Sequence, residues 1–139
     1  MKRLVLAWPI AAAAFLALDA PWLMVMTPRL YQPEIGALLA AEPRMGPAVL
    51  FYVLYISGIV AFAIAPALQR RSARGGLVRG AGLGLLAYGT YDLTSHAVLA
   101  VWSWRVTLID MAWGAALTGA AAFVASWAVL KLERVQARR

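Results

Sequence analysis

The chain has 139 residues, of which 63% are hydrophobic and only 14% are charged, and its mean hydropathy is +0.74. Soluble domains carry roughly 25% charged residues, so the composition excludes an ordinary soluble domain and predicts an integral membrane protein. The net charge of +7 does not indicate a nucleic-acid partner, because the Lys and Arg residues cluster at the ends of apolar runs. There is no Cys, so disulfides, thiol chemistry and Cys-ligated metals are excluded.

Four apolar runs cover about residues 4–26, 46–68, 77–101 and 107–130. Each is long enough for the roughly 20 residues that a helix needs to cross a ~30 Å hydrocarbon core. Helices are expected because lipid cannot satisfy backbone polar groups. The sequence therefore predicts an all-α integral membrane protein, a four-transmembrane-helix bundle in which residues 1–139 form a single transmembrane domain.

The first run has the basic start and small residues of a signal peptide, but it continues apolar beyond Asp19, so we interpret it as an uncleaved span. The connection after it, "TPRLYQPEIGALLAAEPR" (27–44), contains three prolines. Proline disfavours a helix that continues through it. We therefore expect an interfacial loop with a short amphipathic helix at 34–41, and we assign Tyr31 to the aromatic belt at the membrane surface.

The third and fourth runs are rich in small residues. Gly76, Gly80 and Gly84 form two overlapping steps of four, and "GAALTGAAAFVAS" fills the fourth run. Such spacing lets two helices approach closely in lipid, so we expect these two spans to pack together.

Orientation follows from the distribution of positive charge. Cytoplasmic loops of membrane proteins carry an excess of Lys and Arg. With four spans, ten of the thirteen cations fall on the side of the two termini and only Arg29, Arg44 and Arg105 on the other. Both termini are therefore predicted to be cytoplasmic, in a multi-pass protein of the bacterial inner (plasma) membrane.

Three carboxylates lie inside the predicted spans. At ~1.5 Å per residue, Asp19 and Asp92 each lie about 22 Å from the cytoplasmic start of their spans, and Asp110 lies roughly 5 Å below the outer edge. All three share one level, in the outer third of the core. Acids in lipid face a bundle interior and have partners, so we predict one site with Asp19, Asp92 and Asp110 as candidate catalytic groups.

Aromatic and hydroxyl side chains fall at the same depth or on the same helix faces as these acids. From this placement we predict that they bind the ligand: Trp22, Tyr52, Tyr55, Tyr88, Ser95 and Trp113. The alternative is that the acids only form hydrogen bonds that lock the bundle.

A metal site is not predicted. Asp92 and His96 have the spacing of two ligands on one helix face, but the only His of the chain would have to be joined by carboxylates alone. We assign His96 to the outer interface and expect no metal and no cofactor.

Four segments together resemble a bacterial family of four-span membrane proteins, domain of unknown function 2177: "LDAPWL" (18–23), "FYVLYISG" (51–58), "AYGTYDLTSHAVL" (87–99) and "TLIDMAWG" (107–114). The resemblance covers nearly the whole chain, and it adds Tyr91 and Thr94 to the candidate ligand-binding residues. Its remaining motif positions are Asp19, Trp22, Tyr52, Tyr55, Asp92, Asp110, Trp113 and Gly114. Asn is usual in the family at position 95, and His is not typical at position 96. The family has no established activity, so the resemblance implies a fold and a site but no reaction.

Three functions fit these observations. The first is the binding or modification of a lipid or other amphiphile, in a pocket where acids of different environment could serve as general acid and base. The second is an accessory or structural subunit that packs on a membrane-protein partner or on its own copies through its small-residue faces. The third is a small proton- or cation-coupled transporter. The sequence does not decide whether the protein is an enzyme.

Overall fold

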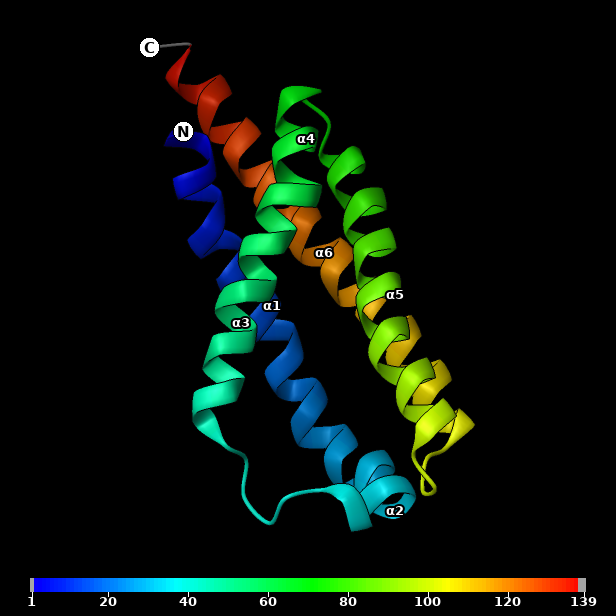
Figure 1. Cartoon of the computed structure of the whole chain (residues 1–139). Coiled ribbons are helices and arrows are strands. Elements are labelled where there is room, and N and C mark those ends of the chain that lie inside the picture. Colours follow the sequence, from blue (N-terminus) through cyan, green and yellow to red (C-terminus); the bar gives the residue numbers. More distant parts are fainter. Residues whose placement is uncertain (1, 138–139) are drawn as a thin grey trace.

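The computed structural model describes residues 2–137 and is all-helical, with 89% helix and no strand among these residues. It contains four helical segments. Figure 1 shows them side by side, with the start of the first and the end of the last at the same end of the molecule. The all-α prediction is confirmed.

The first segment is longer than predicted. Helix α1 (Lys2–Met26) continues through a π-helical turn, η1 (Thr27–Tyr31), into α2 (Gln32–Ile35) and the 3₁₀ turn η2 (Gly36–Leu38). The loop expected over 27–44 is therefore confined to residues 39–44, and the short helix expected at 34–41 instead ends at Leu38 and continues from the first helix. Pro28 and Pro33 do not end the helix. Each lies where the hydrogen-bond pattern changes, to π-helical at residue 27 and back to α-helical at residue 32, and such local adjustments accommodate a proline within a helix.

The other three segments lie close to the predicted ranges. The second comprises α3 (Met45–Ile59), the π-helical η3 (Val60–Ile64) and α4 (Ala65–Gln69). It is followed by α5 (Ala73–Val98) and α6 (Trp104–Gln136). Helix α5 begins earlier than expected because the Ser72 side chain accepts a hydrogen bond from the Gly75 N–H (3.0 Å) and caps it.

Three of the four segments among residues 2–137 are long and apolar enough to cross a membrane: Lys2–Leu38, Met45–Gln69 and Trp104–Gln136. The α5 segment is less apolar, because glycines and polar residues replace large hydrophobic side chains along it.

The core lies where α1, α3, η3 and α6 meet. One stripe of α1, formed by Ala7, Ala11 and Phe15 at intervals of four residues, is fully buried. Four-residue spacing keeps these side chains on one face of the helix. They pack against Ile59 and Leu117 of the neighbouring helices, so large parts of the other faces stay apolar and exposed.

Helix α5 packs closely on α6 through its glycines. A Cβ atom built on Gly84 would lie 2.0 Å from the carbonyl oxygen of Gly114, and one on Gly80 would lie 2.6 Å from that of Thr118. Neither position has room for a side chain. The close approach predicted for these two helices is therefore confirmed.

Candidate functional site

Asp19 continues the buried stripe of α1. It follows Phe15 by one turn, is only 6% exposed, and its two carboxylate oxygens accept hydrogen bonds from different helices. The Tyr52 hydroxyl of α3 donates to Oδ2 (2.7 Å) and the Trp113 Nε1–H of α6 donates to Oδ1 (3.4 Å). Asp19 therefore links three helices.

Asp110 accepts a hydrogen bond from Tyr31, a residue that we had expected at the membrane surface. The Tyr31 hydroxyl donates to Asp110 Oδ1 (2.5 Å) and accepts a hydrogen bond from Trp22 Nε1–H (3.0 Å). Tyr31 reaches this position because η1 continues the first helix. It lines the cavity described below and was not among the predicted site residues.

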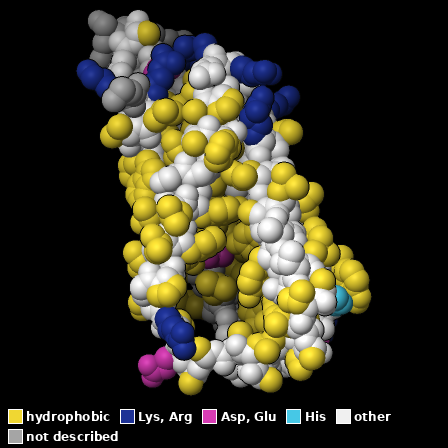
Figure 2. All heavy atoms as spheres, in the orientation of Figure 1, with side chains coloured by type: hydrophobic (Ala, Val, Ile, Leu, Met, Phe, Trp, Pro, Cys, Tyr) yellow, Lys and Arg dark blue, Asp and Glu magenta, His cyan; other side chains and the backbone are white. Residues whose placement is uncertain are grey.

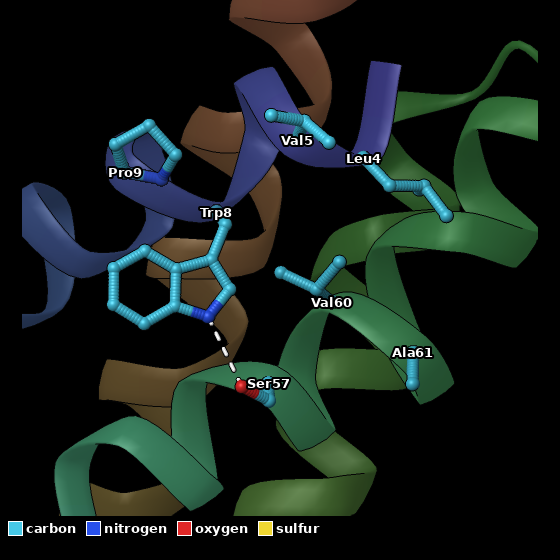
Figure 3. Close-up of a pocket in the computed structure, with 7 residues that line it drawn as sticks. All are labelled: Leu4, Val5, Trp8, Pro9, Ser57, Val60 and Ala61. Atoms are coloured by element: carbon cyan, nitrogen blue, oxygen red, sulfur yellow. Dashed lines mark hydrogen bonds between the residues drawn. The ribbon is translucent and has the colours of Figure 1, made fainter. Parts of the chain in front are cut away.

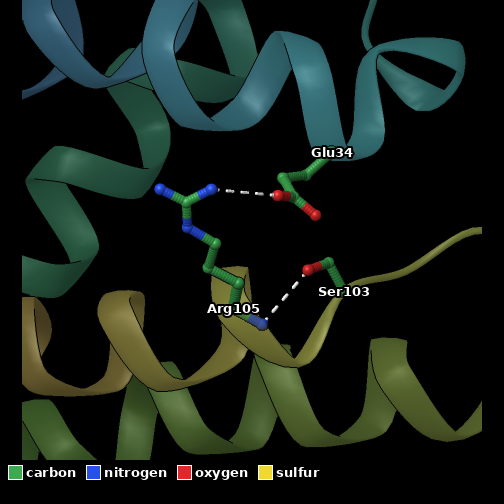
Figure 4. Close-up of polar contacts among 3 residues, drawn as sticks. All are labelled: Glu34, Ser103 and Arg105. Atoms are coloured by element: carbon green, nitrogen blue, oxygen red, sulfur yellow. Dashed lines mark hydrogen bonds and ion pairs between the residues drawn. The ribbon is translucent and has the colours of Figure 1, made fainter.

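A small second core holds the η1–α2 segment against the start of α6. Leu30 and Ile35 bury their side chains beside Val106. An exposed ion pair adds to this contact, since Arg105 Nη1 lies 3.4 Å from Glu34 Oε1, and the Arg105 backbone N–H donates to the Ser103 hydroxyl (Figure 4). These contacts place Tyr31 over Asp110.

The two acids belong to four-residue units with the same Asp-x-x-Trp spacing, "DAPW" (19–22) and "DMAW" (110–113). The indoles of Trp22 and Trp113 stack on one another, and each donates its N–H towards the other unit's acid, directly to Asp19 from Trp113 and through Tyr31 to Asp110 from Trp22. The shared Asp-x-x-Trp spacing is the sequence signal that could have indicated this pairing.

A cavity of about 250 Å³ lies between the two units. Its walls come from α1, η1, α3, α5 and α6, and its lining residues are Asp19, Trp22, Leu23, Tyr31, Phe51, Tyr52, Tyr88, Tyr91, Asp110 and Trp113. Figure 2 shows this face of the molecule hollowed between α3 and α5, with an acidic side chain at the bottom of the hollow. Two of the three candidate carboxylates thus share one cavity.

Asp92 does not line this cavity. It is fully buried in the α5–α6 contact, and neither of its carboxylate oxygens has a hydrogen-bond partner among the described residues. One turn to either side, Gly89 lies against Met111 and His96 lies 3.4 Å from the Thr107 hydroxyl. Across residues 2–137, no three His, Asp or Glu side chains lie close enough together to hold a metal ion.

The remaining candidates divide into two groups. Tyr88 and Tyr91 line the cavity, and Tyr88 packs directly over Gly114. Tyr55 does not line it, and its hydroxyl is hydrogen-bonded to that of Thr118 (2.9 Å). Thr94 and Ser95 do not line it: the Thr94 hydroxyl is exposed and donates to carbonyl oxygens of its own helix. His96 packs against the Trp104 ring, with centroids 4.2 Å apart.

A larger cavity, of about 520 Å³, lies between α1 and the α3–η3 segment near the end of the molecule that carries the N terminus. Leu4, Val5 and Val60 are among its residues (Figure 3). Its polar side-chain groups, Trp8 Nε1 and Ser57 Oγ, are hydrogen-bonded to one another (3.1 Å). No titratable side chain lines it, so we place the candidate site at Asp19 and Asp110.

The chemistry of that site is set by its lining. It offers two carboxylates, four phenols and two indoles, and no Lys, Arg or His lines it. Carboxylates accept hydrogen bonds and attract cations, and aromatic faces attract ammonium groups. The lining therefore favours a ligand that is a cation or a hydrogen-bond donor over an anion.

Comparison with known proteins gives one finding. Residues 4–127 match the model of a family described as a predicted membrane protein, DUF2177. No curated protein and no solved structure matches the chain. The match covers the same part of the chain as the four motif segments and confirms their resemblance.

Proposed function

The chain belongs to the DUF2177 family of membrane proteins, and on that premise we propose that it binds a lipid or other amphiphile whose head group carries an ammonium. The head group occupies the cavity between Asp19 and Asp110, and the apolar tail leaves it along the helix surfaces. One observation carries the proposal: two carboxylates face an aromatic cavity whose lining contains no cationic side chain.

We place the cavity in the outer leaflet of a bacterial inner membrane that α1, α3–α4, α5 and α6 all cross, with both termini in the cytoplasm. Charge supports this orientation, since Lys and Arg gather at the end of the molecule where the N terminus lies (Figure 2). Arg29, Arg44 and Arg105 supply the few cations of the opposite end, as expected from the positive-inside rule.

The cavity also meets a condition that a ligand-binding function requires. A tightly packed interior at the level of the acids would leave no room for a head group, whereas about 250 Å³ is open there. Phe51 and Tyr91 on its rim are substantially exposed, so an amphiphile can approach between α3 and α5 from the surrounding lipid.

Modification of the bound amphiphile would use the same two acids. Their surroundings differ, because Asp19 accepts two hydrogen bonds and is 6% exposed, whereas Asp110 accepts one at Oδ1 and is partly exposed. Two carboxyl groups in different environments are the arrangement that general acid–base chemistry uses. Asp110 is the more accessible of the two.

Native mass spectrometry of the full-length protein, titrated with phosphatidylethanolamine, tests the proposal. Asp110→Asn should weaken binding by about tenfold or more, because it removes the charge from a charge-assisted hydrogen bond. The amide oxygen can still accept from Tyr31, so the fold should persist, as checked by circular dichroism. Glu42→Gln, which removes a carboxylate outside the cavity, is the matched control and should bind like the wild type.

Two results would overturn this function. One is an unchanged affinity for phosphatidylethanolamine in Asp110→Asn. The other is an equal loss in Asp110→Asn and Glu42→Gln, which would indicate a general effect of surface charge.

A second function is that of an accessory subunit of a larger membrane complex or a homo-oligomer. It is favoured by Asp19, because both of its carboxylate oxygens already accept a hydrogen bond within the protein. An acid that accepts two hydrogen bonds from other helices behaves as a lock of the bundle. Purification in mild detergent at native expression level distinguishes this function, because an accessory subunit should bring a stoichiometric partner with it. A single species of monomer mass would reject it.

A further inference from the structure

We propose a second ligand site at the opposite end of the molecule: a basic cavity between the α4–α5 turn and the C-terminal part of α6 that binds the phosphate of an anionic phospholipid. It depends on the membrane orientation proposed above, which puts this end at the cytoplasmic surface. It does not depend on a ligand in the Asp19–Asp110 cavity.

The cavity has a volume of about 320 Å³ and combines two elements that are distant in sequence. Its lining residues are Arg71, Ala73, Trp127, Leu130, Lys131 and Arg134. Arg71 comes from the turn after α4, where its φ of 49° places it in the left-handed region. Such a conformation is uncommon for a residue other than glycine, so this turn holds Arg71 in a defined position.

The charges of this cavity are unbalanced. Three cationic side chains line it, and no carboxylate does. The nearest acid, Glu133, forms an ion pair with Arg3, and its other oxygen lies 3.7 Å from Arg71 Nη1. Among the described residues Lys131 and Arg134 form no ion pair. Because Glu133 partly neutralises Arg71, an anion that binds here would chiefly balance the charges of Lys131 and Arg134.

The aromatic member of the lining favours a lipid over a free anion. Lys131 Nζ lies 4.7 Å from the centre of the Trp127 ring, and this indole is 49% exposed. Trp residues concentrate at the level of lipid head groups, and basic pockets between helices on the cytoplasmic side bind anionic head groups. Leu130 adds an apolar wall. Phosphate can thus contact the cations while the glycerol and the acyl chains lie along Trp127 and Leu130.

The test uses native mass spectrometry of the full-length protein with phosphatidylglycerol and with phosphatidylcholine of the same acyl chains. Wild type should retain phosphatidylglycerol more strongly. Each cation near an anionic lipid contributes about fivefold in affinity, so Lys131→Gln/Arg134→Gln should weaken phosphatidylglycerol binding roughly 25-fold. Arg74→Gln/Arg79→Gln is the matched control, because it removes two exposed cations outside the cavity. It should bind like the wild type.

Three results would overturn the proposal. The first is an equal loss in both double variants, which would indicate diffuse surface charge. The second is equal retention of phosphatidylcholine by the wild type. The third is displacement of phosphatidylglycerol by inorganic phosphate at a similar concentration, which would indicate a site for a free anion.

Two further measurements keep the outcome interpretable. If the double variant does not fold by circular dichroism, the single Lys131→Gln replaces it, with an expected loss of about fivefold. Asp110→Asn should leave phosphatidylglycerol affinity unchanged, so failure of this proposal can be told apart from failure of the outer cavity.

Discussion

The indole rings of Trp22 and Trp113 stack in parallel, with their centroids 4.0 Å apart and an interplanar angle of 4°. This contact joins α1 to α6 at the level of the outer cavity. Trp113 donates its N–H directly to Asp19. Trp22 donates its N–H to the Tyr31 hydroxyl, which in turn donates to Asp110. The two acids are thus held by one reciprocal network of hydrogen bonds and ring stacking. A substitution in one Asp-x-x-Trp unit should therefore change how much the other unit contributes to stability.

A double-mutant cycle measures that dependence. Trp22→Leu and Trp113→Leu should each lower the free energy of unfolding, and the double variant should lose less than the sum of the two. The expected coupling is about 0.5–1.5 kcal/mol beyond area burial, typical of aromatic pairs. Thermal unfolding of the four proteins in one detergent provides the values. Additive effects would contradict the reciprocal network.

Tyr31→Phe should destabilise the protein by about 1–3 kcal/mol, because it leaves the Trp22 N–H and one Asp110 oxygen without their partner. Tyr91→Phe is the matched control: Tyr91 is 63% exposed, and its hydroxyl forms no hydrogen bond with a described residue. It should unfold at the wild-type temperature. Equal effects of the two variants would contradict the assignment of Tyr31 to the site.

Gly84→Ala should destabilise by about 1–3 kcal/mol, the range for overpacking, because its new Cβ would meet the Gly114 carbonyl at 2.0 Å. Gly82→Ala tests the same substitution two residues earlier, where nothing lies within 4 Å. Because Ala favours a helix by up to about 1 kcal/mol over Gly, this variant should be neutral or stabilising. Thermal unfolding distinguishes the pair, and a stable Gly84→Ala would show that α5 is not held against α6.

Asp92→Asn and Asp19→Asn should change stability in opposite directions. Asp92 is buried with both oxygens unpaired, so removal of its ionisable group should stabilise by about 1 kcal/mol. Asp19 accepts two hydrogen bonds, one at each oxygen. Asn keeps only one acceptor oxygen, so Asp19→Asn leaves one donor unpaired and should cost about 1–3 kcal/mol. Melting temperatures of both variants check this. A lower melting temperature in Asp92→Asn would mean that the Asp92 carboxylate has a partner which protein side chains do not supply.

Single-cysteine labelling tests the orientation directly, because the chain contains no Cys. With a membrane-impermeant maleimide on spheroplasts, Glu42→Cys should react, and Gln136→Cys should react only after lysis. Ser126→Cys, which is buried between helices, should not react in either case. The reverse pattern for Glu42→Cys and Gln136→Cys would invert the topology.

Much of the fold could be predicted from the sequence because membrane physics is restrictive. Runs of apolar residues long enough to cross lipid become helices, and the glycine spacing of Gly76, Gly80 and Gly84 indicated which two would pack together. The ends of the helices were harder. Proline was interpreted as a helix breaker at positions 28 and 33, but a local change between α- and π-helical hydrogen bonding accommodates both residues, and composition does not reveal such a change.

The depth of the site along the helices could be predicted, but the direction in which each side chain points around its helix could not. Counting residues placed Asp19 and Asp110 at one level, and the structure puts both on one cavity. The same count cannot tell which way a side chain turns around its helix. Asp92 therefore shares the predicted depth but faces α6 in a separate contact, and Thr94 faces outward. Tyr31 was not predicted as a site residue because a residue expected in a loop has no defined helix face.

The glycines that let α5 lie against α6 also bear on how the protein is made. They remove the large apolar side chains that would carry a helix into lipid on its own, and α5 is the segment that lacks the hydropathy of a span. Helix α6 is both more apolar and joined to it by a short turn. The two segments should therefore enter the bilayer as a hairpin, and a chain cut after residue 103 should leave α5 outside the membrane, accessible to protease.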